Sequence, residues 1–248
     1  MGAAVVNRDE LNRAVSDARL DAVTGAIATT AGIALGANPV SAAVAGASGP
    51  ALKLAQRRFA RAVERRQNRA AQALEQAAAM LDVGLDIIEE RVADHDARLE
   101  LLARVLGAAA QSSFDQKVTA LARVLADGLR EDGPPDDSFV LAAALADMEV
   151  AHVLALRHLA AAPSPPDDLR RSDRPARGWE VPQIEQAMPD LAEVMYSVVA
   201  VLAGHGLIRD QGGVTYPGNI GPAVWKVTAL GRRCLFLLGE GSMRPDGS

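Results

Sequence analysis

Two stretches decide the fold of this chain: DLAEVMYSVVAVLAGHGLIRD, residues 190–210, and AVWKVTALGRRCLFLL, residues 223–238. The first predicts an amphipathic helix that ends at a glycine, and LIRD and AVWKVT predict two strands joined by a glycine-rich connection. Thr228 stands where an N-cap residue is expected, so that ALGRRCLFLL forms a last helix. This order of helix, two-stranded wing and helix predicts a winged-helix-like domain over residues 145–240.

The predicted domain has a helix in the position that reads DNA in winged-helix proteins. This helix, from Asp190 to His205, contains no Lys or Arg, and Asp190 and Glu193 occupy the first turns, which normally face bases and phosphates. Four cations could contact phosphates from the wing side: Arg209, Lys226, Arg232 and Arg233. Affinity for DNA depends on the number of such contacts. The pattern therefore favours a module that contacts protein and argues against nucleic acid as the partner.

Composition places the whole chain in the mainly α class. Aromatic residues make up only 3% of the 248 residues, and Ala and Leu dominate, which favours helices over sheets. The net charge of −5 excludes a general basic surface for nucleic acid. Cys234 is the single cysteine, which excludes an intrachain disulfide and a cysteine-based zinc site. Its place within RRCLFLL predicts a buried side chain.

The strongest periodic signal runs over residues 51–111. Apolar positions there recur three, four or seven residues apart, which predicts a long amphipathic helix that Gly84 and Gly107 could bend or end. The positions of this stripe are Leu74, Leu81, Leu85, Ile88, Val92, His95, Leu99, Leu102 and Leu106.

Shorter helices follow the stripe. FDQKVTALARVLADGL predicts a helix that REDGPPDD ends. Ser138 is expected to cap FVLAAALA, and Asp147 to cap MEVAHVLALRHLAA. Residues 163–178, rich in Pro, Asp and Arg, predict a mobile surface loop. The predicted divisions are an Ala/Gly-rich hairpin with a basic helix over 1–73, a helical bundle region over 74–144, the winged-helix-like domain over 145–240 and a disordered tail over 241–248.

Residues 22–52 contain no charged side chain. Asn38-Pro39 interrupts this run, because proline lacks the amide donor, and the interruption predicts a hairpin of two Ala/Gly-rich helices. A helix over residues 22–37 would be about 24 Å long against a hydrocarbon core of about 30 Å, so a permanent membrane span is not expected. The small residues spaced for close helix packing, as in bilayers, are Gly25, Gly32 and Gly36.

A basic stretch follows the uncharged run at once. It carries seven cations against Glu64, a net charge of +6 within 17 residues. An anionic membrane attracts such cations by about 1 kcal/mol each. We therefore expect a hairpin that packs against its own protein and that associates with anionic lipid or with other copies when it is released. Two small-residue helices buried in a soluble core are the alternative. The expected lipid-binding cations are Lys53, Arg57, Arg58, Arg61, Arg65, Arg66 and Arg69.

An acidic region comes next in the sequence. Between Glu75 and Glu100 the chain carries eight carboxylates against Arg91 and Arg98, a net charge of −6. Such a region could cover the basic stretch and hold it in a latent state, or it could simply balance the charge of the chain.

No catalytic or metal site is predicted. DHD, residues 94–96, cannot converge on one ion because adjacent helical residues point about 100° apart, and His95 is expected to be a hydrogen-bonded core histidine. EVAH, residues 149–152, has the spacing of a di-iron bundle, which would need a second copy and two further carboxylates. No nucleophile arrangement surrounds His158 or His205, and no phosphate-binding glycine loop follows a strand. We therefore expect no enzyme activity, no metal and no cofactor.

Four segments follow one another along the chain: RLELLARVLGAAAQ, FVLAAALADMEVAHVLALRHL, GHGLI and WKVTALGRRCLFLL. Over about residues 95–240 this layout resembles bacterial abortive-infection alpha-type proteins. That family pairs an N-terminal helical part with a winged-helix-like unit that ends in a Leu-Thr-x-x-Gly helix start. The corresponding motif here is VTALG, with Val227 in place of Leu. The resemblance implies a role in phage defence or stress response and supplies no catalytic residues.

Together these patterns predict a non-enzymatic helical effector or adaptor. Its winged-helix-like domain contacts a protein partner, and its residues 22–69 bind the inner membrane when exposed. A DNA-binding transcription regulator and a structural oligomerisation protein built on the stripe between residues 74 and 106 are the alternatives, and a homo-oligomer remains open. The stretch NRDELNRAVSDARLD does not resemble a secretory signal, so the expected location is the cytoplasm, with peripheral attachment to the inner membrane.

Overall fold

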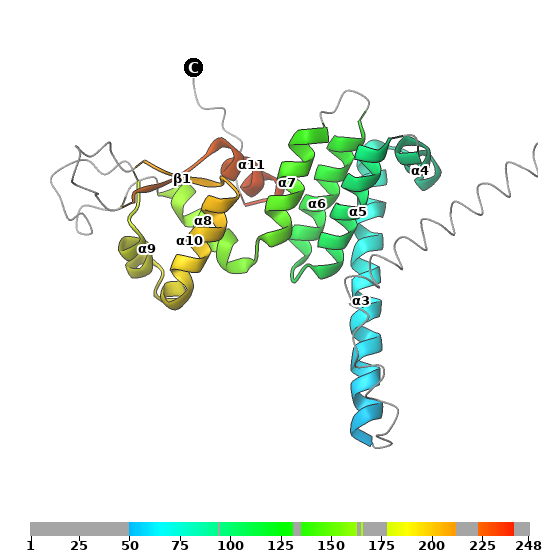
Figure 1. The fold of residues 1–248 in the computed structure, drawn as a ribbon, viewed down its shortest axis with the longest axis horizontal. Helices are drawn as coiled ribbons and strands as arrows, with labels where there is room; N and C mark the ends of the chain where they lie inside the picture. Colours follow the sequence, from blue (N-terminus) through cyan, green and yellow to red (C-terminus); the bar gives the residue numbers. More distant parts are fainter. Residues whose placement is uncertain are drawn as a thin grey trace, which may run out of the picture. The chain divides into compact units, whose positions relative to one another are not determined.

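The computed structural model describes residues 50–93, 95–130, 135–162, 165, 178–211 and 223–240. Over these residues the chain is mainly helical and has one two-stranded antiparallel sheet, which confirms the predicted fold class (Figure 1). The chain divides into two compact units, residues 1–65 and residues 66–248. The predicted hairpin with its three glycines, nearly all of the predicted loop and the predicted tail lie outside the described residues.

Helix α3 runs without interruption from Pro50 to Leu81, so the predicted boundary after residue 73 falls inside it. In its second half the buried face consists of small side chains, which let neighbouring backbones approach closely. These side chains are Ala70, Ala73, Ala77 and Ala78.

The predicted long helix is broken after α3. Asp82 adopts a left-handed backbone with φ of 54°, and the amide of Val83 bonds to the carbonyl of Ala78 at 3.2 Å, a pairing that ends helices. Helix α4 (Leu85–Ala93) and helix α5 (Asp96–Gln111) follow. The expected break near Gly84 is therefore present, whereas Gly107 lies inside α5. The predicted stripe is therefore divided among three separate helices.

Helices α5, α6 (Asp115–Leu129) and α7 (Pro135–Asp147) lie side by side and form the main core (Figure 1). Nearly all of α6 is buried, because neighbours cover it on several sides. Ser138 is a buried residue within α7 and does not cap it, contrary to our expectation, because this helix begins three residues earlier at Pro135. Proline suits the first turn of a helix, since its missing amide hydrogen has no partner there anyway.

Helix α8 (Val150–Ala161) follows α7 after a bend of 114°. The predicted cap Asp147 is wrong, because that residue ends α7 and Glu149 is the N-cap of α8. The Glu149 side chain accepts a bond from the backbone of the first turn, and His152 Nδ1 accepts the Glu149 amide at 2.9 Å. This reciprocal capping box stabilises the start of α8.

The C-terminal part has the predicted element order. Helices α8, α9 (Val181–Ala187) and α10 (Met195–Gly204) precede the wing strands β1 (Ile208–Asp210) and β2 (Trp225–Val227), and α11 (Ala229–Leu237) follows them. The segment predicted to begin the long helix forms a separate 3-10 helix, η3 (Pro189–Val194), so that α10 begins only at Met195.

The joint between the wing and α11 forms as the sequence predicted. Thr228 accepts the amide of Gly231 at 3.1 Å and donates its hydroxyl to the carbonyl of Gly206 at 2.7 Å. In the antiparallel sheet, Ile208 pairs with Val227, whose side chain is buried. The capping threonine therefore holds the last helix against the start of the wing.

Candidate functional site

The exposed surface of η3 and the first turn of α10 is the first candidate surface. Val194 and Tyr196 are 47% and 66% exposed, and Asp190 and Glu193 are exposed beside them. Between residues 189 and 205 the sequence has no Lys or Arg. This face therefore presents apolar groups with carboxylates at one end, an arrangement that suits a protein partner and repels phosphates.

The four wing-side cations do not gather on α10. Arg209 and Lys226 face each other across the two strands. Arg233, on α11, pairs with Asp137 of α7 at 3.4 Å, and Arg232 is exposed on the same helix. Like charges directly opposite each other destabilise a sheet. The pair of Arg209 and Lys226 is therefore a stronger candidate for contact with an anionic partner than the two arginines of α11.

The exposed part of α3 is the second candidate surface. Four of the predicted lipid-binding arginines are exposed, and Phe59 beside them is 60% exposed. Arg69 is partly buried, with Nη2 at 3.9 Å from Oδ1 of Asp115. Lys53 and Arg57 belong to α3, but their side chains lie outside the described residues, as do the three glycines of the hairpin. The exposed arginines are Arg58, Arg61, Arg65 and Arg66.

We name residues 58–66 the basic segment. Arg58, Arg61 and Arg65 follow one another at three- and four-residue spacing, so they share one face of α3. Phe59 and Val63 are four residues apart and form an adjacent apolar strip. A helix with arginines beside an exposed aromatic ring is typical of segments that bind lipid surfaces or partner helices.

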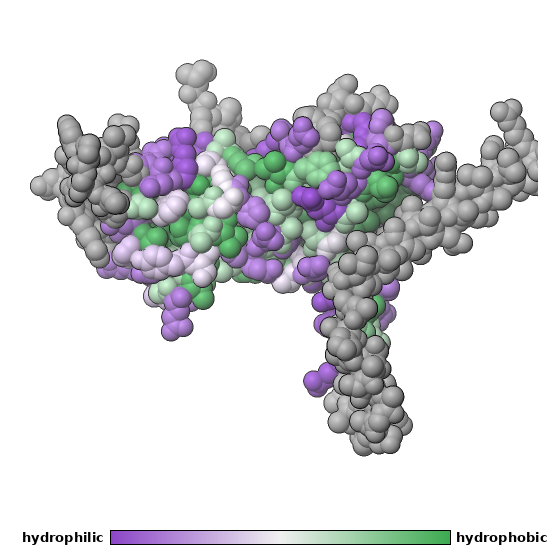
Figure 2. All heavy atoms as spheres, viewed as in Figure 1, coloured by the Kyte–Doolittle hydropathy of each residue, from purple (hydrophilic) through white to green (hydrophobic). Residues whose placement is uncertain are grey.

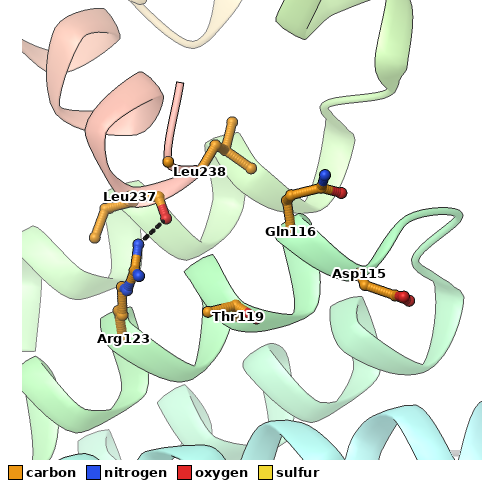
Figure 3. A pocket seen from close by; sticks show the side chains of 7 residues that line it. Asp115, Gln116, Thr119, Arg123, Leu237 and Leu238 are labelled. Carbon is orange, nitrogen blue, oxygen red and sulfur yellow. Dashed lines mark hydrogen bonds between the residues drawn. The ribbon is translucent and has the colours of Figure 1, made fainter. Parts of the chain in front are cut away.

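An open cleft of about 400 Å³ lies between α6 and the end of α11. Figure 3 shows Arg123 reaching across it, where Nη1 donates to the carbonyl of Leu237 at 2.6 Å, while Asp115 and Gln116 point away from this contact. The guanidinium is thus occupied with the last carbonyls of α11, where a cation is favourable. The geometry is that of a joint between α6 and α11.

A buried charge occupies the bend between α7 and α8, which we name the elbow (residues 146–149). Lys117 of α6 is 1% exposed, and its Nζ donates to the carbonyls of Ala146 and Met148 at 2.7 and 2.8 Å. Nζ also lies 3.6 Å from Oε1 of Glu149. Burial lowers the pKa of the Lys117 ammonium, and Glu149 partly opposes this. These contacts satisfy carbonyls that the end of α7 leaves without helical partners.

The sequence did carry a signal for this contact. Lys117 precedes Leu121 by four residues and Leu125 by eight, so it falls on the apolar face of its own helix. The ammonium group of a lysine at such a position must either reach solvent or donate hydrogen bonds to buried acceptors. The acceptors come from a helix about thirty residues further along the chain, which sequence spacing does not reveal.

The histidines have structural environments. His95 is exposed at the start of α5, so the expectation of a core histidine is wrong, because this residue lies in the break between α4 and α5. His205 Nε2 lies 2.9 Å from Oδ2 of Asp147 and links the end of α10 to the elbow. The spacing of EVAH serves the capping box, in which His152 takes part. Among the described residues no group of His, Cys, Asp or Glu could hold a metal ion.

His158 packs against Trp179 with ring centroids 4.7 Å apart, and its buried Nε2 has no hydrogen-bond partner among the residues that the structure describes. Burial lowers the pKa of His158, and burial likewise lowers that of His152. Because the folded chain resists protonation there while the unfolded chain titrates near the ordinary value of about 6.5, stability is lost as the pH falls below that value.

We expect His158→Phe to reduce this loss of stability in acid. Phe keeps the aromatic contact with Trp179 and cannot take up a proton. Urea midpoints measured at neutral pH and near pH 5 should differ less for the variant than for the parent chain. His95→Phe is the matched control, because His95 is exposed, and it should leave the difference unchanged. Equal acid sensitivity in His158→Phe would contradict the assignment.

Cys234 is fully buried, as predicted. Burial raises the pKa of its thiol to about 12 despite the neighbouring Arg233. The neutral thiol is therefore the form present at physiological pH, and it acts as a small apolar side chain in the core.

Among the described residues no single helix has the length and apolar character needed to cross a membrane. Helices α7 and α8 meet the criteria of length and composition only as a pair, with the 114° bend between them.

No protein-family model matches this chain, and neither a curated protein nor a solved structure is significantly similar to it.

Proposed function

We propose that this chain is a non-enzymatic adaptor or effector that attaches to anionic membrane surfaces through α3 and contacts a protein through its winged-helix-like unit. The observation that carries the proposal is the basic segment, where an exposed Phe59 accompanies four exposed arginines. The proposed location is the cytoplasm with peripheral attachment to the inner membrane. A role in phage defence or stress response remains the prediction that the family resemblance implies.

The energetics of the basic segment support lipid binding. Each cation close to an anionic surface contributes about 1 kcal/mol, so the four exposed arginines contribute about 4 kcal/mol in total. Burial of Phe59 in the interface adds a contribution that salt does not screen. Arg69 contributes less, since Asp115 lies near its guanidinium. The uncharged run that precedes the segment could add close helix packing or shallow insertion.

The protein contact is proposed for the exposed surface of η3 and the first turn of α10. Its exposed Val194 and Tyr196 would be covered by an apolar partner surface, and Asp190 and Glu193 favour cations at the edge of that surface. Aromatic residues such as tyrosine are enriched at the centres of protein interfaces.

Vesicle co-flotation tests the membrane proposal. A triple variant, Arg58→Gln, Arg61→Gln and Arg65→Gln, should lose roughly a hundredfold in partition onto anionic vesicles, since three cations at about 1 kcal/mol each are removed. The matched control neutralises three exposed or half-exposed cations elsewhere, Arg209, Lys226 and Arg232, and should bind as the parent does.

Binding of the parent should also weaken as salt rises from about 0.1 M to about 1 M, because the screening length falls from about 10 Å to about 3 Å. Vesicles of neutral lipid should bind little at either salt concentration. Absence of the parent from anionic vesicles at low salt would contradict the proposal. So would a loss of vesicle binding in the control triple variant equal to that of the basic triple variant.

DNA binding is the second candidate function, and the facing pair of Arg209 and Lys226 is the observation in its favour. Filter binding with random duplex DNA tests it, and affinity should fall steeply with salt if phosphates are contacted. The third candidate, an oligomer built on the predicted stripe, stays a prediction with less support than the other two. The stripe is divided among three helices, and Ile88 and Leu102 are buried within the chain itself.

A further inference from the structure

We propose that the basic segment of α3 docks onto an acidic surface of α4 and α5 in a second copy of this chain. The inference rests on the proposed function in one respect, since the docked segment is the one assigned to lipid. Self-association would then be the stored form, in which the arginines are covered, and an anionic membrane would compete for them.

The acidic surface joins the end of α3 to the first turns of α4 and α5. Leu85 and Leu99 on it are 50% and 45% exposed, which makes it both acidic and partly apolar. Figure 2 shows hydrophilic side chains interspersed with hydrophobic ones at the α4 end. The exposed carboxylates that define this surface are Asp82, Asp86, Glu90, Asp96 and Glu100.

The cations nearest in sequence do not neutralise this surface. Arg91 Nη1 donates to the carbonyl of Leu129, and Arg98 Nη2 donates to the carbonyl of Arg130, each at 3.3 Å. Both arginines thereby stabilise the negative end of α6, where the last carbonyls lack helical partners. Of the carboxylates on the acidic surface, Glu100 has an ion pair with Arg104 at 3.2 Å. A net negative charge is therefore left facing outward.

The basic segment complements this surface in charge and in exposed apolar groups. Its arginines match the carboxylates, and Phe59, 60% exposed, matches the exposed leucines. An exposed ion pair alone contributes little, about 0.2–1 kcal/mol. Several such pairs around an apolar contact give an interface that holds at low salt and dissociates at high salt.

Within α3, Arg66 lies well before the end of the helix at which the acidic surface starts. At about 1.5 Å per residue, Arg66 lies about 22 Å along α3 from Leu81, whereas α4, which begins just after that end, is only about 14 Å long. The contact of Arg69 with Asp115 places this part of α3 near the start of α6. Helix α5 extends about 24 Å from its acidic start to its end near Asp115. We therefore assign the acidic surface to the basic segment of a second copy, on the complementary charges and the exposed apolar groups of the two surfaces.

This contact uses two different surfaces of the chain and is therefore heterologous. Each copy that docks its basic segment still offers its own acidic surface to the next copy, so the association continues head to tail unless the rotation closes a ring.

Sedimentation velocity of the full chain in the absence of lipid tests the inference. The parent should associate at about 0.1 M salt and be monomeric at about 1 M salt. The basic variant is Arg58→Gln with Arg61→Gln and Arg65→Gln, and the acidic variant is Asp86→Asn with Glu90→Gln and Asp96→Asn. Each variant alone should be monomeric at both salt concentrations, because one of its two surfaces is lost.

An equimolar mixture of the two variants is the decisive sample. The basic variant keeps its acidic surface and the acidic variant keeps its basic segment, so the mixture should form a complex of two chains and nothing larger. The matched control, with Arg209, Lys226 and Arg232 changed to Gln, should associate as the parent does. A parent that is monomeric at low salt, variants that still associate alone, or a mixture without the complex would each overturn the inference.

The two proposals fail in distinguishable ways. Loss of vesicle binding with intact self-association would reject the membrane role and leave the docking contact standing. Vesicle binding by a parent chain that stays monomeric would reject the docking contact and leave the membrane role standing. If both hold, anionic vesicles should convert the associated parent to lipid-bound monomers, and neutral vesicles should not.

Discussion

Replacing Lys117 with Met should lower the free energy of unfolding by about 3 kcal/mol. The ammonium donates to the carbonyls of Ala146 and Met148 at 2.7 and 2.8 Å, and hydrogen bonds to charged groups contribute about 1.5–3 kcal/mol each. Met has nearly the same length but no donor, so both carbonyls would remain at the elbow without this partner.

An opposing effect makes the expected loss in the free energy of unfolding smaller than the full contribution of the two hydrogen bonds. Burial disfavours the ammonium, as its lowered pKa shows, and Met carries no such cost. The position of the contact argues that the loss is still large. The elbow joins α7 to α8, and His205 also bonds to Asp147 there, so that a loosened elbow weakens the link between the three-helix core and α10.

Urea unfolding measured at neutral pH checks the value. Lys226→Met is the matched control, because that lysine is half-exposed on β2, and it should change stability by less than about 0.5 kcal/mol. A Lys117→Met variant as stable as the parent would show that the buried ammonium costs as much as its bonds contribute.

The pH dependence of the parent follows from the same group. Because the pKa of Lys117 is lowered in the folded chain, the unfolded chain binds more protons between that lowered value and the ordinary value of about 10.4. Stability due to Lys117 therefore rises with pH across this alkaline interval, and the difference between the parent and Lys117→Met should widen there.

Replacing Gly231 with Ala should destabilise the chain by about 3 kcal/mol. A Cβ on Gly231 would lie well inside contact distance of the Leu207 carbonyl oxygen and 2.9 Å from Cγ1 of Val227. The carbonyl cannot move away freely, because it accepts the Thr228 amide at 3.0 Å. The added methyl group would therefore push α11 away from the wing.

Gly107→Ala is the matched control for this prediction. Gly107 lies inside α5, and no described residue has an atom within 4 Å of the position of its missing Cβ outside its own stretch of helix. Since alanine favours a helix interior over glycine by about 1 kcal/mol, this variant should be more stable than the parent. Thermal unfolding followed by circular dichroism separates the two variants, whose midpoints should shift in opposite directions. A shift of Gly231→Ala toward higher temperature would contradict the packing argument.

The same position explains a motif in physical terms. In VTALG the threonine caps α11 by accepting the amide of Gly231, and the glycine permits the close approach to Leu207. The sequence indicated the cap at Thr228, because capping depends on residues within one turn. It did not indicate why the third residue after the threonine must be small, because Leu207 is twenty-four residues earlier in the chain.

Local patterns mislead at the break after α3 and at the starts of α7 and α8. The spacing of three and four residues along the stripe predicts a single helix. In the structure the left-handed backbone of Asp82 ends α3, and the chain continues as the separate helix α4. His95 was placed in a core on the strength of that spacing and is exposed. Ser138 and Asp147 were assigned as caps because they have suitable side chains. Helix α7 begins at Pro135, and the Glu149 capping box sets the start of α8.

Sequence by itself determined the mainly helical class, the wing strands, the Thr228 cap and the absence of cations from the helix before the wing. Each of these depends on residues within a few positions of one another, where propensity and capping act. Only the tertiary structure decided that Lys117 is buried against the elbow and that Arg91 and Arg98 face the end of α6. Those contacts join residues about thirty or more positions apart, and packing between helices, which no local pattern encodes, selects the partners.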